Sequence, residues 1–170
     1  MKKALIVIDM QNDFVFDALG SADAQKILPN VIKRIEKARA DGEQVIFTRD
    51  THENDYLTTQ EGRKLPVPHC IKGTRGWAIC DGLYQSGDLV FDKPVFGSIE
   101  LAKYLQQKSF DGIEFIGVCT DICVVSNVLL AKAVCLQTEV FVRENCCAGL
   151  SKDKHNAALE TMRSCQVTVL

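Results

Sequence analysis

Short apolar runs alternate with helix-like patterns along this chain, and this alternation constrains its fold more than any other feature. The first run, residues 4–8 (ALIVI), has no polar position, so it is expected to be a strand buried on both faces. The segment from Asp23 to Ala40 has apolar residues at helical spacing and ends at an Asp-Gly pair. Further strands are predicted at residues 44–48, 88–93, 113–118, 138–143 and 166–170. Further helices are predicted at residues 98–107, 121–134 and 151–163.

This order of elements favours a single α/β domain. Strands that alternate with helices form a parallel sheet covered on both faces, so we expect a three-layer α/β/α fold with a six-stranded, mainly parallel sheet. The 170 residues are a normal length for one domain, and neither a repeat nor a linker divides residues 1–170. A loop of about 35 residues follows the second predicted strand, and loops of that length are often functional.

Charge and hydropathy narrow the classes of partner. The chain has 20 Lys and Arg against 22 Asp and Glu, a net charge of −2 without a basic block, which disfavours nucleic-acid binding. No segment reaches the ~20 apolar residues that a membrane-spanning helix needs. The first apolar run stops at Asp9, too soon for a signal peptide. We therefore expect a cytoplasmic protein without nucleic-acid or membrane partners, whose eight cysteines are free thiols.

Chemically capable side chains stand where the predicted strands end. Asp9 follows the first strand, Lys93 ends the third, and Cys123 lies just after the fourth. Ligands of parallel sheets bind outside the carboxyl ends of the strands, so these side chains are expected to meet. With Thr120 as the helix N-cap, Cys123 would lie in the first helical turn, where the helix terminus and an ammonium shift a thiol toward thiolate. The three side chains could act as nucleophile, proton acceptor and charge stabiliser; the alternative is a cysteine that only fills the core.

The long loop contains a second group of chemically capable side chains. Asp50 and His52 form a D-x-H pair, His69 follows 17 residues later, and Glu61 lies between them. Imidazole nitrogens and carboxylate oxygens suit a divalent transition metal, and three protein ligands leave positions open for water or substrate. Unrelated surface Asp and His residues are the alternative.

Five stretches resemble the isochorismatase-like cysteine hydrolases: LIVIDMQNDF, TRDTHEND, PVPHCIKGTRGW, FDKPVFGS and GVCTDICVVSNVLLA. The pattern is most similar to that of nicotinamidases and is collinear from residue 4 to the C-terminus. The resemblance implies the isochorismatase-like hydrolase fold and a homo-oligomeric cytoplasmic enzyme of NAD salvage. It also implies hydrolysis of nicotinamide to nicotinate and ammonia through a thioester.

The resemblance also implies a role for individual residues. Cys123 resembles the family nucleophile, Asp9 its general base and acid, and Lys93 the third member of the triad. The oxyanion hole would consist of the backbone N–H groups of Cys119 and Cys123, with a cis peptide bond before Cys119. Phe14 is expected to line the pocket for a planar ring, although core packing would explain an aromatic residue there equally well.

The metal loop matches the family in the same way. Asp50, His52 and His69 resemble its ligands for zinc, manganese or iron, of which we expect zinc, and Glu61 matches a further ligand of some members. In nicotinamidases the metal holds the pyridine nitrogen and orients the amide toward the thiolate.

The chain departs from the nicotinamidase pattern at one position that bears on the substrate. Nicotinamidases usually have a tryptophan three residues before the ligand histidine, where this chain has Pro66, and Trp77 is a candidate replacement. A related cysteine hydrolase for another small amide or carbamoyl compound is therefore the alternative.

Two other classes of protein fit the sequence less well. A nucleotide-binding module would need a glycine-rich loop after the first strand, and DMQNDF stands there instead. A catalytically inactive interaction protein would be free to lose any member of the triad, so the presence of all three residues argues against that class of protein. His155, on the polar side of the last predicted helix, is expected to be solvated.

Overall fold

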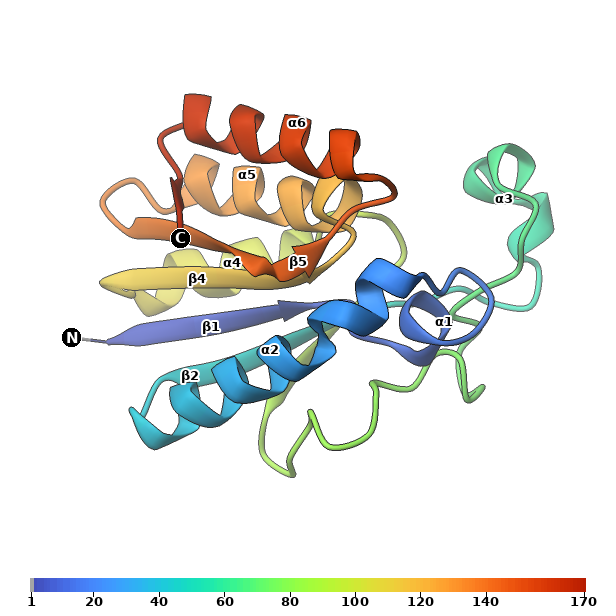
Figure 1. Ribbon diagram of the computed structural model, residues 1–170, viewed down its shortest axis with the longest axis horizontal. Coiled ribbons are helices and arrows are strands. Elements are labelled where there is room, and N and C mark those ends of the chain that lie inside the picture. The colour runs from blue at the N-terminus through green and yellow to red at the C-terminus, as the bar shows by residue number, and fades with distance from the viewer. Residues whose placement is uncertain (1) are drawn as a thin grey trace.

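A computed structural model describes residues 2–170 and has a six-stranded sheet at its centre (Figure 1). The strands lie in the order β3-β2-β1-β4-β5-β6, and every neighbouring pair is parallel. They are β1 (Lys3–Ile8), β2 (Gln44–Asp50), β3 (Leu89–Lys93), β4 (Gly112–Val118), β5 (Glu139–Ala148) and β6 (Thr168–Val169). The helices are α1 (Asn12–Val15), α2 (Ala22–Ala40), α3 (Gln60–Lys64), α4 (Ile99–Lys108), α5 (Val125–Val134) and α6 (Lys152–Ser164). The predicted three-layer fold is confirmed.

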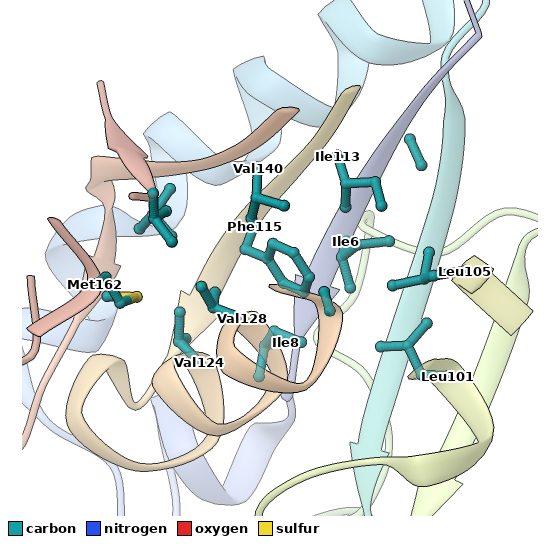
Figure 2. Packing of buried hydrophobic residues seen from close by; sticks show 14 of the residues in the cluster. Ile6, Ile8, Leu101, Leu105, Ile113, Phe115, Val124, Val128, Val140 and Met162 are labelled. Carbon is teal, nitrogen blue, oxygen red and sulfur yellow. The ribbon is translucent and has the colours of Figure 1, made fainter. Parts of the chain in front are cut away.

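The apolar sequence of β1 is explained by burial on both faces. Ile6 and Ile8 belong to a core formed with α4, α5 and α6 (Figure 2), whereas Leu5 and Val7 belong to a second core formed with α2. All four side chains are fully buried, and burial of one such side chain contributes about 1.5–3 kcal/mol. The central strand is therefore held firmly, and so is the position at which it ends.

The helices begin close to where the sequence indicates. Ser21, Ser98 and Ser151 are the N-caps of α2, α4 and α6, and each side chain accepts a hydrogen bond from a backbone N–H in the first turn. The structure differs from prediction in the long loop, where it has a short 3₁₀ turn (Tyr56–Thr58), α3, and a segment, residues 76–78, that accepts backbone hydrogen bonds from α1. It also extends β5 to Ala148.

The predicted helix from residue 121 to residue 134 is divided in the structure. A π-helical turn, Thr120–Val124, which we name the Cys123 turn, precedes α5. The predicted N-cap was wrong, because Cys119 occupies that position and Thr120 lies inside the turn with its hydroxyl directed elsewhere. The Cys123 turn has no side-chain cap of its own.

Two features place a site at the junction of β1 and β4. Strands β1, β2 and β3 follow one another toward one edge of the sheet, and β4, β5 and β6 follow one another toward the other edge, so the strand order reverses between β1 and β4. Ligands of such sheets bind outside the carboxyl ends of the strands at this point of reversal. The two strands also approach each other closely there. Gly117 has a φ of +120°, and a Cβ atom at that position would lie 2.1 Å from the carbonyl oxygen of Ile8. Figure 1 shows α1, α3 and the long loop beyond these strand ends.

Within residues 2–170, every helix is too short or too polar to cross a bilayer.

Candidate functional site

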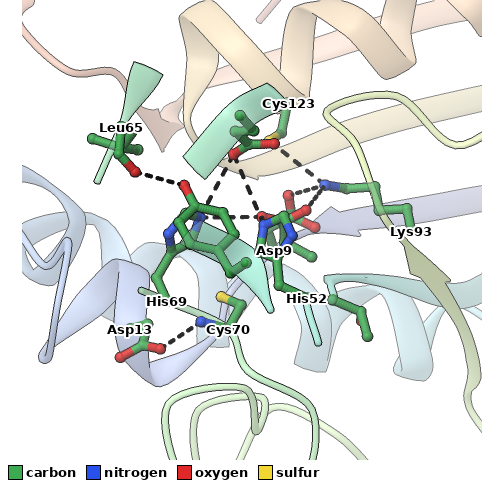
Figure 3. A network of polar contacts seen from close by, with 12 residues as sticks. Asp9, Asp13, His52, Leu65, His69, Cys70, Lys93 and Cys123 are labelled. Atoms are coloured by element: carbon green, nitrogen blue, oxygen red, sulfur yellow. Dashed lines mark hydrogen bonds and ion pairs between the residues drawn. The ribbon is translucent and has the colours of Figure 1, made fainter. Parts of the chain in front are cut away.

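The structure brings together the three side chains that follow strands β1, β3 and β4. The Lys93 Nζ atom lies 2.7 Å from Oδ2 of Asp9 and 3.6 Å from Sγ of Cys123 (Figure 3). Asp9 has a φ of 48°, in the left-handed region, and the Thr48 hydroxyl donates a 2.6 Å hydrogen bond to its Oδ1 atom. All three side chains are buried, so each charge interacts with its neighbours more strongly than it would in water.

The charges of this trio differ from expectation in one respect. Burial raises the pKa of Cys123 well above its ordinary value, and the negative charge of Asp9 raises it further, while Lys93 acts in the opposite direction. The prediction that Cys123 is shifted toward thiolate was therefore wrong, because burial outweighs the ammonium. Burial also raises the pKa of Asp9, which makes its carboxylate a stronger base than an exposed aspartate. The trio thus consists of a neutral thiol beside a carboxylate that can accept its proton.

Four potential metal ligands converge beside the trio. One ligand atom from each of Asp50, His52, Glu61 and His69 lies within 4.8 Å of the others. Oδ2 of Asp50 is 3.1 Å from Nε2 of His52 and 3.5 Å from Nε2 of His69, and Oε1 of Glu61 is 3.8 Å from each of these nitrogens. Burial acts to raise the pKa of Asp50, but both imidazoles and Lys93 lower it well below the usual range. Two imidazoles and two carboxylates at this spacing fit a divalent transition metal.

Tyr56 holds the imidazole rings of this cluster. Its ring is fully buried, with its centroid 4.7 Å from that of His52 and 5.0 Å from that of His69. Its hydroxyl donates a 2.9 Å hydrogen bond to the carbonyl oxygen of Leu65. The Nδ1 atom of His69 lies 2.8 Å from the carbonyl oxygen of Val67, and donation there leaves Nε2 free to act as a ligand. The sequence pointed to the imidazoles but not to the tyrosine that packs on both.

Two buried polar side chains near the end of β1 hold the segment that carries the potential metal ligands, residues 50–69, in place. Gln11 accepts a 2.7 Å hydrogen bond from the N–H of Asp50 and donates to the carbonyl oxygens of Asp50 and Trp77. Asp13 accepts a 2.7 Å hydrogen bond from the N–H of Cys70, next to His69. The signal in the sequence was a polar motif, DMQNDF, immediately after a fully apolar strand.

Comparisons with known proteins agree with this arrangement. The model of the isochorismatase domain matches residues 3–170. The chain belongs to the isochorismatase family. It is 29% identical to the nicotinamidase/pyrazinamidase of Mycobacterium tuberculosis, over 99% of this chain and 98% of that protein. It is 26% identical to the nicotinamidase of Schizosaccharomyces pombe, over 98% of this chain and 92% of that protein.

Solved structures of the isochorismatase family have the same fold. The pyrazinamidase of Pyrococcus horikoshii, determined in complex with zinc, superposes with a TM-score of 0.88 and 29% identity, over 100% of this chain and 99% of that one. The prediction of a nicotinamidase-like amide hydrolase with the isochorismatase fold is confirmed.

The other residues that the resemblance to the isochorismatase family singled out lie around the same site. The peptide bond between Val118 and Cys119 is cis, as the resemblance to the isochorismatase family implied, and Cys119 directly precedes the Cys123 turn. Phe14 lies beside the cluster of potential metal ligands, with its ring centroid 5.5 Å from that of His69, and it also packs against the core beneath α2. All eight cysteines are free thiols, as predicted.

Trp77 is already engaged by its neighbours. The Arg49 guanidinium lies 3.7 Å from the centre of the indole ring, and the indole N–H donates to the Thr51 hydroxyl at 2.9 Å. The indole therefore supports the strand end that carries Asp50, and one of its faces is covered by Arg49.

Proposed function

We propose that this isochorismatase-family hydrolase is a metal-dependent nicotinamidase that converts nicotinamide to nicotinate and ammonia through a thioester on Cys123. One observation carries the proposal: the ammonium of Lys93 contacts both Asp9 of the thiol site and Asp50 of the ligand cluster, at 2.7 and 3.2 Å. A group held by the cluster would lie beside the thiol. Nicotinamide has a pyridine nitrogen and an amide carbon on one rigid ring, and so presents both to such a pair of neighbouring sites.

The first half of the reaction forms the thioester. Asp9 takes the proton from Sγ of Cys123, and the thiolate attacks the amide carbon to form the C–S bond. The protonated Asp9 then gives its proton to the amide nitrogen as the C–N bond breaks, and ammonia leaves. Lys93 stays protonated and stabilises the negative charge that passes between carboxylate and sulfur.

The second half regenerates the enzyme. Asp9 takes a proton from water, and the hydroxide oxygen attacks the thioester carbon. The C–S bond breaks, Cys123 recovers its proton from Asp9, and the carboxylic acid that forms loses its remaining proton to solvent and is released as nicotinate. In both halves the backbone N–H groups of Cys119 and Cys123 donate to the developing oxyanion, and the ring of Phe14 contacts the ring of the substrate.

Asp50, His52, Glu61 and His69 would hold the metal ion, which we propose to be zinc, with manganese or iron as the other candidates. When bound, a divalent ion at this cluster supplies a Lewis acid that holds the pyridine nitrogen and orients the ring. This donor set is carried by β2, the following loop and α3, so the segment that supports the ion is also the one that Gln11 and Tyr56 fix. We further propose a cytoplasmic homo-oligomer that acts in NAD salvage.

Pro66 supports one alternative substrate class. It stands where nicotinamidases usually have a tryptophan, and the covered face of Trp77 is not free to stack on a ring in its place. A pocket without that stacking residue would also accept a non-aromatic small amide or a carbamoyl compound. The same thiol chemistry would apply to its C–N bond.

Ammonia release from nicotinamide tests the proposal. The zinc-loaded wild type, the metal-free protein and the Cys123→Ala variant are compared, with Cys165→Ala, an exposed thiol, as the control. We expect turnover by the wild type and the control, little by the metal-free protein, and none by Cys123→Ala. If a folded, zinc-loaded wild type fails on nicotinamide but releases ammonia from a non-aromatic amide in a Cys123-dependent manner, the alternative substrate class is correct.

A further inference from the structure

The Cys123 turn is held from outside by α6. The Thr120 hydroxyl oxygen lies 2.8 Å from Nδ1 of His155, one turn into that helix, and the threonine is fully buried. The sequence predicted a solvated His155; in the structure the side chain is only half-buried, but α6 packs against the Cys123 turn and directs the imidazole toward Thr120. The Thr120 side chain is thereby diverted from the capping role that the sequence suggested.

A second contact joins the same two segments. The side chain of Asp121 accepts a 3.0 Å hydrogen bond from the N–H of Leu150, just before α6. Gly149 allows this approach, since a Cβ atom there would lie 2.7 Å from Oδ1 of Asp121 and 3.0 Å from Cβ of His155. Two successive residues of the Cys123 turn are therefore held from this side: Thr120 by α6 itself and Asp121 by the segment just before it.

The contacts from α6 matter to the Cys123 turn because the turn has no side-chain cap of its own. Its N-cap, Cys119, makes no side-chain hydrogen bond to the turn, and the N–H groups of Ile122 and Val124 share one acceptor, the carbonyl oxygen of Cys119. A helix start without a side-chain cap is less stable by about 0.5–2 kcal/mol than a capped one. Here the contacts from α6 replace the cap.

The imidazole is suited to accept a hydrogen bond. Burial lowers the pKa of His155 below its ordinary value, while Glu144 of β5, Asp121 of the turn and Asp23 of α2 act weakly in the opposite direction. A neutral imidazole with its proton on Nε2 presents Nδ1 as an acceptor, and the Thr120 hydroxyl then donates to it.

We propose that His155 is a positioning residue for the thiol reaction of Cys123. By holding Thr120, it fixes the turn between Cys119 and Cys123, whose backbone N–H groups and thiol must converge on one carbonyl group of the substrate. This inference rests on the proposed function for the reaction that it supports. The imidazole itself contacts neither substrate nor reacting atoms.

Two pairs of variants test the hydrogen bond. His155→Leu and Thr120→Val remove one partner each, whereas His155→Asn keeps an acceptor near the place of Nδ1 and Thr120→Ser keeps the hydroxyl. Thr161→Val, at an exposed threonine of the same helix, is the control. We expect His155→Leu and Thr120→Val to lower kcat by about tenfold to a hundredfold with KM nearly unchanged, since displacements of about 1 Å have such effects on catalysis. His155→Asn, Thr120→Ser and Thr161→Val should stay within about threefold of the wild type.

The double variant His155→Leu/Thr120→Val distinguishes one shared interaction from two separate ones. We expect its kcat to be no lower than that of the worse single variant, because both substitutions break the same bond. A fall in thermal stability without a fall in kcat, or a double effect equal to the product of the single effects, would overturn the proposal.

The rate at which iodoacetamide alkylates Cys123, followed by peptide mass spectrometry, separates this inference from the proposed function. It needs no substrate and responds to the position of the thiol. His155→Leu should change the rate at least threefold, and His155→Asn should match the wild type. If nicotinamide is not a substrate but this pattern is observed, the proposed function fails and the positioning role stands. An unchanged rate in His155→Leu, together with normal kcat on any amide that is turned over, rejects the positioning role.

Discussion

The ammonium of Lys93 lies 3.2 Å from Oδ1 of Asp50, which makes one lysine the neighbour of both the thiol site and the metal-ligand cluster. Burial acts to lower the pKa of Lys93, but the negative charges of Asp9 and Asp50 raise it above its usual value. The lysine therefore remains charged in a position with almost no exposure to solvent. Its charge balances two buried carboxylates that would otherwise repel each other.

Replacement of Lys93 by methionine should damage both stability and activity. The side chain keeps nearly the same volume, but Asp9 and Asp50 lose their shared counter-charge, and breaking a buried ion pair in this way costs about 3–5 kcal/mol of unfolding free energy. Lys103→Met is the matched control, because that lysine forms an exposed pair with Glu100, and such pairs contribute about 0–1 kcal/mol. Urea unfolding of the two variants measures the difference. Equal stability of both variants would contradict the shared-charge interpretation.

Replacement of Asp9 by asparagine should separate proton transfer from metal binding. The amide has the shape of the carboxylate but cannot accept the thiol proton, so we expect kcat to fall by about 10²–10⁴. Zinc content should remain near that of the wild type, because Asp9 contributes no atom to the ligand cluster. Ammonia release and metal analysis of the purified variant are the two measurements. Loss of zinc together with activity would show that Asp9 acts on the cluster rather than on the thiol.

The parts of the site that could be predicted from sequence are those that local patterns determine. Apolar runs mark the strands, and in a parallel sheet the strand ends share one edge, so the meeting of Asp9, Lys93 and Cys123 follows from three strand boundaries. The D-x-H pair and His69 are recognisable because imidazoles are rare in this chain, which has three histidines.

The other parts depend on tertiary packing that no local pattern encodes. Gln11 hydrogen bonds to Asp50, which is 39 positions away in the sequence, and to Trp77, which is 66 positions away. Thr120 hydrogen bonds to a histidine that is 35 positions away. The pKa of Cys123 was mispredicted for the same reason, since a helix terminus is visible in the sequence but the depth of burial is not. Each of these features depends on which elements cover the strand ends.

Tyr56 should support metal affinity through its ring rather than its hydroxyl. Tyr56→Leu removes the aromatic surface that packs on His52 and His69, and loss of such a supporting contact typically weakens metal binding about tenfold to a hundredfold. Tyr56→Phe keeps the ring and loses only the hydrogen bond to Leu65, so its zinc affinity should be close to that of the wild type. Competition with a chromophoric chelator gives the affinities. The interpretation is wrong if the phenylalanine variant loses as much affinity as the leucine variant.

Glu114 should make the protein less stable in acid. Its buried carboxylate on β4 accepts hydrogen bonds from Arg34 of α2 at 2.9 Å and from Arg143 of β5 at 2.6 Å. Burial acts to raise the pKa of Glu114, but the two guanidinium groups lower it below its ordinary value. A carboxylate whose pKa is lower in the folded state contributes stability that is complete above its unfolded value of about 4.3, and that is lost as the pH falls through the folded value.

The variant Glu114→Gln tests this dependence on pH. It lacks the titrating group, so we expect it to be less stable than the wild type by about 1–3 kcal/mol at pH 7, since Arg34 keeps its pair with Glu43 at 2.6 Å. The difference between the two proteins should shrink steadily as the pH is lowered below about 4.3, because the wild type then loses what the variant never had. Denaturant unfolding at a series of pH values between 7 and 3 measures this difference. A difference that stays constant over that range would assign the acid sensitivity of the fold to other carboxylates, with Asp50, whose pKa is also lowered in the folded state, as the next to test.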